Sequence, residues 1–423
     1  MGISYIFFFV IILLFMGFDL AAQDSFQINY QTMEKFKLTE VSNWRIRVNN
    51  KYQGLTYKQI RGILEVKESD DKGQLVQGKF FLFSTSKRNT QLIANKIDRI
   101  IDVSFSILAN GRYRIPAGQL FPTTRDFPVF LNEKIRKGKS WSEYGTKYVD
   151  PLNSGKYTRV RFFCEYTYQG EKVYKSKPYH LITAQYALRY KPGDDPKGDQ
   201  DLKQIRNAGH RVEIYFDADN NKPVYLRDMI IENLGGEVFE YKDGRQIVRK
   251  GFTHIWFDHV QTMNKEKIIK DLEKNIEEKE SDKEKDKTRV PDKDDIPGVI
   301  IRENENGINI TLPDIHFVPN KADILPVEKN RLDTVADTLK KIGSVKSRTF
   351  MVTGHTARVG KKENQKQLSV ERARAIVDYL VNKGIPEKQF IYQGKGSEEP
   401  VAPNDTEENR AKNRRVEITI MED

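Results

Sequence analysis

The chain has 423 residues, 38% of them hydrophobic and 31% charged, so it is long enough for two or three domains with substantial cores. Its single cysteine, Cys164, excludes an intramolecular disulfide and is too isolated for a metal site. The net charge is +11 at pH 7, and residues 23–262 carry essentially all of it, yet no nucleic-acid-binding motif is present.

Residues 1–22 have the composition of an export signal. An apolar run from Ile3 to Phe18 is followed by small residues before Gln23, where cleavage is expected. The usual basic residue at the start is missing, so an uncleaved membrane anchor remains the alternative. No cysteine follows the apolar run, which excludes a lipoprotein anchor.

Residues 23–262 have the composition of β-strands. Arg211–Phe216 alternates polar and apolar side chains, and few windows in the region show helical periodicity. Residues 91–101 are the best candidate for a helix. Prolines cluster near residue 125, so we predict a boundary there between two β-rich domains, 23–126 and 127–262.

Polar clusters in this region are interpreted as structural. The run DADNNKP from Asp217 has the alternating acidic spacing of a calcium loop, but the glycine and the downstream glutamate are missing, so a hairpin turn is favoured. His254, Asp258 and His259 lack a further convergent partner, which favours ordinary strand positions. Cys164 lies in an apolar run and predicts a buried thiol. We therefore predict no catalytic residue, no metal site and no cofactor.

Residues 263–297 form a charged segment. Ile268, Ile269, Leu272 and Ile276 give a short apolar stripe at helical spacing. The residues that follow mix both charge signs with almost no apolar content, so they cannot bury enough surface to become ordered. We predict a helical, then disordered, linker that lets the next domain reach a partner at some distance.

Residues 298–423 predict an α+β sandwich in the order β-α-β-α-β-β. The apolar spacing of Leu332, Val335, Ala336 and Leu339 predicts a helix over 326–342. The other expected elements are strands at 308–312, 315–317, 348–353, 390–394 and 415–420, and a helix at 369–383. Ser369 is expected at the N-cap of that helix, which places Arg372 in the first turn. Free backbone N–H groups and a guanidinium there would favour a carboxylate.

The same stretch carries several motifs in a fixed order. Gly354-His355-Thr356 ends a strand, Leu368-Ser369 and Arg372-Ala373 open a helix, and Asn413–Glu417 (NRRVE) begins the last strand. In this order the motifs resemble the OmpA-like peptidoglycan-binding domain family, over roughly residues 300–423. The resemblance implies the same α+β fold.

The resemblance also implies a site for the peptidoglycan stem peptide. Its expected residues here are Arg372, Thr356, Leu368, Phe317 and Arg414. Ala357 stands where the family has the Asp that holds diaminopimelate together with the helix Arg, so the ligand's ammonium meets a methyl group. The missing charge-assisted hydrogen bond is worth roughly 1.5–3 kcal/mol. Val318 replaces a frequent acidic residue, and Gln365 stands at the position of the loop Asn.

Together these features predict a multidomain, exported, non-enzymatic envelope protein, periplasmic or associated with the outer membrane. It would tether or scaffold between peptidoglycan and another envelope component. The alternative is an OmpA-like fold that has lost peptidoglycan binding and serves as a protein–protein interaction module. The basic residues 23–262 predict contact with an anionic membrane surface, peptidoglycan carboxylates or an acidic envelope protein, with solvating lysines as the alternative. An enzyme acting on cell-wall or lipid substrates is disfavoured, because no nucleophile–base pair is recognisable.

Overall fold

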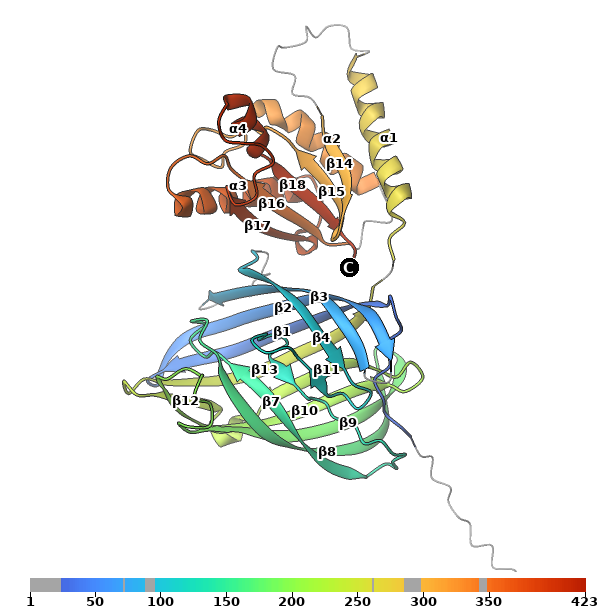
Figure 1. Cartoon of the computed structure of the whole chain (residues 1–423), viewed down its shortest axis with the longest axis vertical. Helices are drawn as coiled ribbons and strands as arrows, with labels where there is room; N and C mark the ends of the chain where they lie inside the picture. Colours follow the sequence, from blue (N-terminus) through green and yellow to red (C-terminus); the bar gives the residue numbers. More distant parts are fainter. Residues whose placement is uncertain (1–23, 71–72, 88–95, 261, 285–297, 342–347) are drawn as a thin grey trace, which may run out of the picture.

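The computed structural model describes residues 24–70, 73–87, 96–260, 262–284, 298–341 and 348–423. The expected export signal at 1–22 and the end of the charged linker, 285–297, lie outside these ranges. The described residues form a large curved sheet and a smaller sheet covered by helices (Figure 1). No helix in these ranges is long and apolar enough to cross a membrane.

The N-terminal region is one antiparallel sheet of 13 strands. The strands are β1 (Lys35–Val48), β2 (Lys51–Asp70), β3 (Gly73–Lys87), β4 (Arg99–Ile107), β5 (Tyr113–Arg114), β6 (Thr124–Arg125), β7 (Ser140–Val149), β8 (Thr158–Tyr174), β9 (Lys177–Tyr190), β10 (Leu202–Asp217), β11 (Lys222–Ile230), β12 (Glu237–Tyr241) and β13 (Gln246–His259). Their order is β5-β4-β3-β2-β1-β13-β11-β10-β9-β8-β7-β6, with β12 pairing β10 and β13. The first and last long strands are therefore neighbours.

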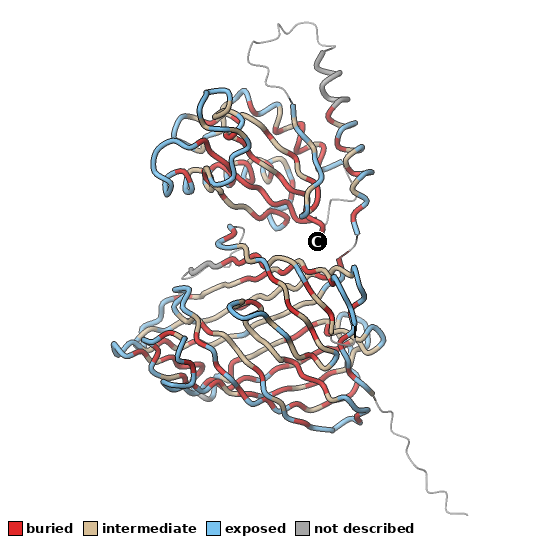
Figure 2. Tube along the Cα trace, viewed as in Figure 1, coloured by how far each residue is buried: buried red, intermediate tan, exposed pale blue. Residues whose placement is uncertain are grey.

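A large apolar core lies against one face of this sheet. Along β8, alternate residues from Val160 to Tyr168 are buried and the residues between them are exposed, except the half-buried Thr167, as expected for a strand with one buried face (Figure 2). Cys164 is among the buried residues, as predicted, and burial raises the pKa of its thiol to about 12. The core draws on strands from both sides of residue 126, and β6 pairs directly with β7. The expected division into 23–126 and 127–262 is therefore not seen.

Local predictions in this region were right for turns and wrong for the helix. The DADNNKP run is the turn between β10 and β11, where the Asp217 carboxylate accepts the backbone N–H of Asn220 at 3.0 Å. The described part of the expected helix at 91–101 is instead extended, with β4 beginning at Arg99. The N–H of Ile97 binds the carbonyl of Tyr392 at 2.8 Å, so a tertiary pairing overrides the local apolar pattern.

The C-terminal region has a five-stranded sheet in the order β14-β15-β18-β16-β17, with β16 and β17 parallel. Its strands are β14 (Ile300–Asn304), β15 (Gly307–Leu312), β16 (Phe350–His355), β17 (Phe390–Gly396) and β18 (Val416–Met421). The helices are α1 (Lys265–Glu284), α2 (Lys329–Lys341), α3 (Lys362–Asn382) and α4 (Glu407–Asn413). This arrangement confirms the predicted α+β fold. The strand expected at 315–317 is reduced to an isolated bridge between Phe317 and Ile324.

The helix of the charged segment belongs to the C-terminal core. Met263, Ile268 and Leu272 are buried together with Leu332 and Leu339 of α2. The apolar stripe predicted from the sequence is thus the buried face of α1. The packed domain consequently begins before residue 298.

The two sheets touch through a small apolar cluster. Phe81 and Phe83 of β3, with Ile97, pack against the outer face of the C-terminal sheet. That face contributes Met351, Ile391 and Met421, one from each of β16, β17 and β18. All six are less than a tenth exposed, so the contact is a closed apolar interface.

Candidate functional site

Helix α3 carries the central residue of the predicted site, and it starts earlier than predicted. It begins at Lys362, so Ser369 lies inside the helix and Arg372 lies in its third turn. The Ser369 hydroxyl donates to the carbonyl of Lys366 at 2.7 Å and accepts the N–H of Gly396 at 2.9 Å. Ser369 is therefore no N-cap, and Arg372 has no free backbone N–H groups of a helix end beside it. Any attraction for an anion has to come from the guanidinium itself.

Two glycines let α3 approach the sheet closely. A Cβ at Gly394 would lie 2.2 Å from the Ser369 hydroxyl oxygen, and a Cβ at Gly354 would lie 2.2 Å from the Ser369 carbonyl oxygen. Larger residues would therefore push the helix away from β16 and β17. This close packing fixes the position of the helix segment that carries Arg372.

The Arg372 side chain is buried, and its head group lies over an aromatic ring. Only 9% of the residue is exposed. Its Nε donates to the carbonyl of Lys321 at 3.2 Å, and its guanidinium carbon is 4.8 Å from the centre of the Phe317 ring. Among the residues described, no carboxylate lies within 4 Å of it. Burial and the nearby charge of Arg414 lower the pKa of this guanidinium.

Arg414, by contrast, forms ion pairs with two carboxylates. Its Nη1 is 2.7 Å from Glu407 and its Nη2 is 3.3 Å from Asp314. The negative charge near the site is thus already engaged by Arg414. A buried cation without a counter-charge is costly, so Arg372 is a position where an anionic ligand would be stabilised.

The two positions that the resemblance expects to be acidic hold no acid. Ala357 is 6% exposed and lies two residues after the end of β16. Val318 is half-buried, and its N–H binds the carbonyl of Asp323 at 2.8 Å. The N–H of Thr356 donates a hydrogen bond to the carbonyl of Gly396 at 2.9 Å. The buried Thr356 hydroxyl has no hydrogen-bond partner within the described part of the chain.

Gln365, in the first turn of α3, binds the loop that precedes the helix. Its Nε2 donates to the carbonyls of Val359 and Gly360 at 3.0 and 2.9 Å, and its Oε1 accepts the Ser397 hydroxyl at 2.5 Å. Because all these bonds are internal, Gln365 ties the loop to the segment after β17. Leu368 is half-buried on α3, one helical turn before Arg372.

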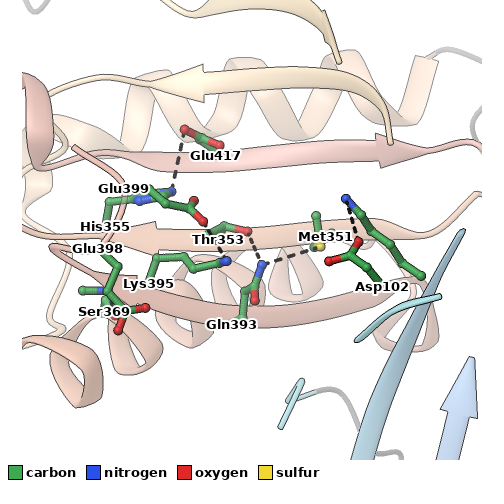
Figure 3. A network of polar contacts seen from close by, with 12 residues as sticks. Asp102, Met351, Thr353, His355, Ser369, Gln393, Lys395, Glu398, Glu399 and Glu417 are labelled. Atoms are coloured by element: carbon green, nitrogen blue, oxygen red, sulfur yellow. Dashed lines mark hydrogen bonds and ion pairs between the residues drawn. The ribbon is translucent and has the colours of Figure 1, made fainter. Parts of the chain in front are cut away.

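A polar row runs along the outer face of β16 and β17 (Figure 3). Thr353 and Gln393 are joined at 3.3 Å, and His355 lies beyond them, near Glu417. His355 is 3% exposed and neither of its ring nitrogens has a hydrogen bond within the described ranges. Burial, with the charges of Arg415 and Lys395, lowers its pKa to about 3, so the ring is neutral near pH 7.

The side chains of this candidate site were predicted from the sequence, but a backbone partner of Arg372 was not. The carbonyl of Lys321, which anchors the Arg372 guanidinium, belongs to a turn closed by the N–H of Lys321 on the carbonyl of Val318. A carbonyl carries no residue-type signal, so no pattern would have identified it. The start of α3 was missed because Lys361 and Lys362 are ordinary polar residues with no capping side chain.

Comparisons with known proteins match the C-terminal part of the chain to a family. Residues 316–414 match the family model for the OmpA family. Outer membrane protein A of Bordetella avium is 37% identical over 108 residues, covering 26% of this chain and 54% of that protein. Peptidoglycan-binding protein ArfA of Mycobacterium tuberculosis is 36% identical over 117 residues, covering 27% of this chain and 35% of that protein. The chain thus spans about half or less of these curated relatives.

Solved structures also match the C-terminal part of the chain. An outer membrane protein from Borrelia burgdorferi B31 is 36% identical, covering 29% of this chain and 97% of that chain, with a TM-score of 0.25.

Proposed function

Since residues 316–414 form an OmpA family domain, we propose that this chain is a non-enzymatic envelope protein that links peptidoglycan to another envelope component. The OmpA domain supplies the contact to the wall. The basic N-terminal sheet supplies the contact to the second component. Relatives of the domain are named as outer membrane and peptidoglycan-binding proteins, which supports a place in the cell envelope.

One observation carries the proposal: Arg372 is buried, anchored on the Lys321 carbonyl, and lacks a carboxylate among the described residues. A carboxylate of a cell-wall stem peptide would provide the missing counter-charge. A charge-assisted hydrogen bond of this kind contributes about 1.5–3 kcal/mol. Phe317, lying under the guanidinium, keeps the head group in place for such a ligand.

The contact between the two sheets supports a scaffolding role. Because Met351, Ile391 and Met421 pack on Phe81 and Phe83, the domain holds a defined orientation on the N-terminal sheet. A rigid connection of this kind would fix the position of the peptidoglycan contact relative to the contact made by the N-terminal sheet. A long free linker would only limit their separation.

The test is retention of the full chain on purified peptidoglycan. Weak retention is expected, because Ala357 leaves the ligand's ammonium without a carboxylate. Arg372→Ala should remove it. Arg374→Ala is the matched control, because Arg374 lies on the same helix, is exposed, and only pairs with Asp378 at 3.7 Å. Equal loss in both variants would contradict a role for the Arg372 site.

The alternative is a domain that has lost peptidoglycan binding and contacts another protein. The observation that favours it is that Ala357 and Val318 stand at the two positions where the resemblance expects an acid. Under this alternative Arg372→Ala does not change the retention of the full chain on peptidoglycan, whatever the basic N-terminal sheet contributes to it. The same retention experiment therefore separates the two functions.

A further inference from the structure

The face of the N-terminal sheet that is turned away from the large apolar core carries a cluster of aromatic side chains. Tyr215 and Tyr225 belong to this cluster, whereas their chain neighbours Phe216 and Leu226 belong to the large core. Successive side chains of a strand point to opposite faces, so the cluster lies on the outside of the sheet. Its other members are Leu181, Tyr174, Tyr179 and Trp256.

The rings of this cluster stack on one another across the strands. The ring centre of Tyr174, at the end of β8, lies 4.7 Å from that of Tyr225 in β11, and the two planes differ by 2°. Tyr225 is in turn 5.6 Å from Trp256 of β13, whose indole N–H donates to the Tyr174 hydroxyl at 3.3 Å. Phe252, which is 37% exposed, extends the row by an edge contact with His254 at 4.8 Å. The cluster is thus ordered and reaches the surface.

A hydrogen-bond donor without an acceptor lies among these rings. Arg227 of β11 is the register partner of His254 in β13. The Arg227 Nε is buried without a hydrogen-bond partner, and no carboxylate lies within 4 Å of this guanidinium, within the described ranges. Glu213, the register neighbour of Arg227 on β10, is instead 3.8 Å from the Lys172 ammonium. Arg227 therefore offers N–H groups to a ligand.

His254 provides a second donor beside Arg227. Burial, together with the charge of Arg227, lowers the pKa of His254, so the ring is neutral near pH 7. Burial raises the pKa of Tyr225 to about 12, so the Tyr225 hydroxyl keeps its proton and donates it to Nδ1 of His254. The other ring nitrogen, Nε2, then carries the imidazole proton. No residue in the described part of the chain accepts it.

The cluster lies on the same face of the sheet as the contact with the OmpA domain, but apart from that contact. A row of register partners runs from Trp256 of β13 through Thr39 of β1 and Arg61 of β2 to Phe81 of β3. Phe81 packs on the OmpA domain, so β1 and β2 separate the aromatic cluster from this contact. An extended ligand can therefore reach the cluster beside the docked domain.

We propose that this cluster binds a sugar chain, with Arg227 and His254 donating hydrogen bonds to its oxygens and with Phe252 and Trp256 contacting its C–H groups. The inference rests on the proposed function, in which the N-terminal sheet makes the second envelope contact, and it names the chemistry of that contact. Sugars combine acceptor oxygens with polarised C–H groups, which suit donors placed beside electron-rich ring faces. A lipid tail would leave both donors without acceptors.

Calorimetric titration of the full chain at about 0.15 M salt tests the inference. The probes are chitohexaose, a neutral sugar chain, and a hyaluronan octasaccharide, an acidic one. These two probes separate a neutral from an acidic ligand. Polyglutamate is the control that carries carboxylates without sugar rings. Saturable binding is expected for at least one sugar chain and not for polyglutamate.

Two variants with matched controls locate the binding. Arg227→Met should weaken it roughly tenfold, because the donated hydrogen bonds are lost. Arg161→Met should leave it unchanged, since Arg161 is an exposed arginine on the same sheet whose guanidinium carbon also lies over a ring, 4.0 Å from the centre of Tyr144. Phe252→Ser removes an exposed ring and should also weaken binding, whereas Phe163→Ser, at a position 48% exposed, should not.

Arg372→Ala should leave sugar binding intact, so failure of this inference is distinguishable from failure of the Arg372 site. Absence of saturable binding to both sugar chains, equal binding of polyglutamate, or equal loss in the control variants would overturn the proposal. Binding to anionic vesicles that is lost in Phe252→Ser, without any sugar binding, would assign the cluster to a membrane surface and would overturn it as well.

Discussion

Lys35, the first residue of β1, pairs with Glu422, the penultimate residue of the chain. The other carboxylate oxygen of Glu422 accepts the N–H of Met263 at 3.0 Å. Lys37 lies 3.5 Å from Asp423. The start of the N-terminal sheet, the segment before α1 and the last strand are thus tied together. The C-terminal domain therefore rests on the sheet, whereas the charged segment had suggested a free tether.

Ile391→Glu should separate the two sheets. Ile391 is 1% exposed and faces the apolar contact, so a carboxylate there is desolvated without a partner. Small-angle scattering is expected to show a larger radius of gyration for this variant. Val401→Glu is the control, because Val401 is 61% exposed in the same domain. Unchanged scattering from Ile391→Glu would mean that the polar contacts suffice to hold the orientation.

His355 makes the stability of the C-terminal domain sensitive to acid. Its pKa is about 3 in the folded state and about 6.5 in the unfolded chain. A depressed folded pKa means that the unfolded state binds the proton first, so stability is full above pH 6.5 and is lost as pH falls toward 3. About 2 kcal/mol should be lost between pH 7 and pH 5.

Calorimetric unfolding at the two pH values measures this loss. His355→Gln removes the titrating group and should reduce the pH dependence by that amount. His259→Gln is the control, because the His259 side chain is 70% exposed. Equal pH dependence in the wild type and His355→Gln would contradict the assignment.

Much of the fold was readable from local pattern. The spacing of Leu332, Val335 and Leu339 predicted α2. The strand predicted at 415–420 is β18, in which Val416, Ile418 and Ile420 are buried. The periodicity of apolar residues and the preferences of turn residues both depend on neighbours a few positions apart. Sequence patterns are informative over this short range.

Pairings between distant segments were not readable in this way. Phe36 of β1 pairs with His259 of β13, and no residue pattern in either strand indicates that these two strands are partners. For the same reason one sheet was divided into two domains at a proline cluster. The interface residue Met351 alternates with the core residue Phe350, so both faces of β16 look equally buried, and the sequence alone did not show that one face meets the other domain.

The basic N-terminal region should bind anionic surfaces in a salt-dependent way. Essentially all of the net charge of +11 lies in residues 23–262. The Debye length falls from about 30 Å at 0.01 M salt to about 3 Å at 1 M, so attraction to anionic vesicles should disappear over this range. Co-sedimentation with anionic and with zwitterionic vesicles measures it. No binding to anionic vesicles at the lowest salt would assign these lysines to solubility.

Ala357→Asp should strengthen the binding of diaminopimelate-type stem peptide. The new carboxylate supplies the partner for the ligand's ammonium that the native wall lacks, while Arg372 holds the ligand's carboxylate. A tenfold gain in affinity corresponds to about 1.4 kcal/mol, which is within the range of one charge-assisted hydrogen bond. Calorimetric titration of the full chain with a soluble stem peptide measures the change, with circular dichroism confirming that each variant is folded.

Two further variants decide how the gain arises. Ala357→Asn has the same shape without the charge and should give little of the gain. Adding Arg372→Ala to Ala357→Asp should abolish it, because the ligand's carboxylate then loses its cation. Tight binding by the native chain would show that another residue replaces the family Asp. No gain in Ala357→Asp would mean that Val318 and the internally bonded Gln365 leave the pocket shaped for a protein partner.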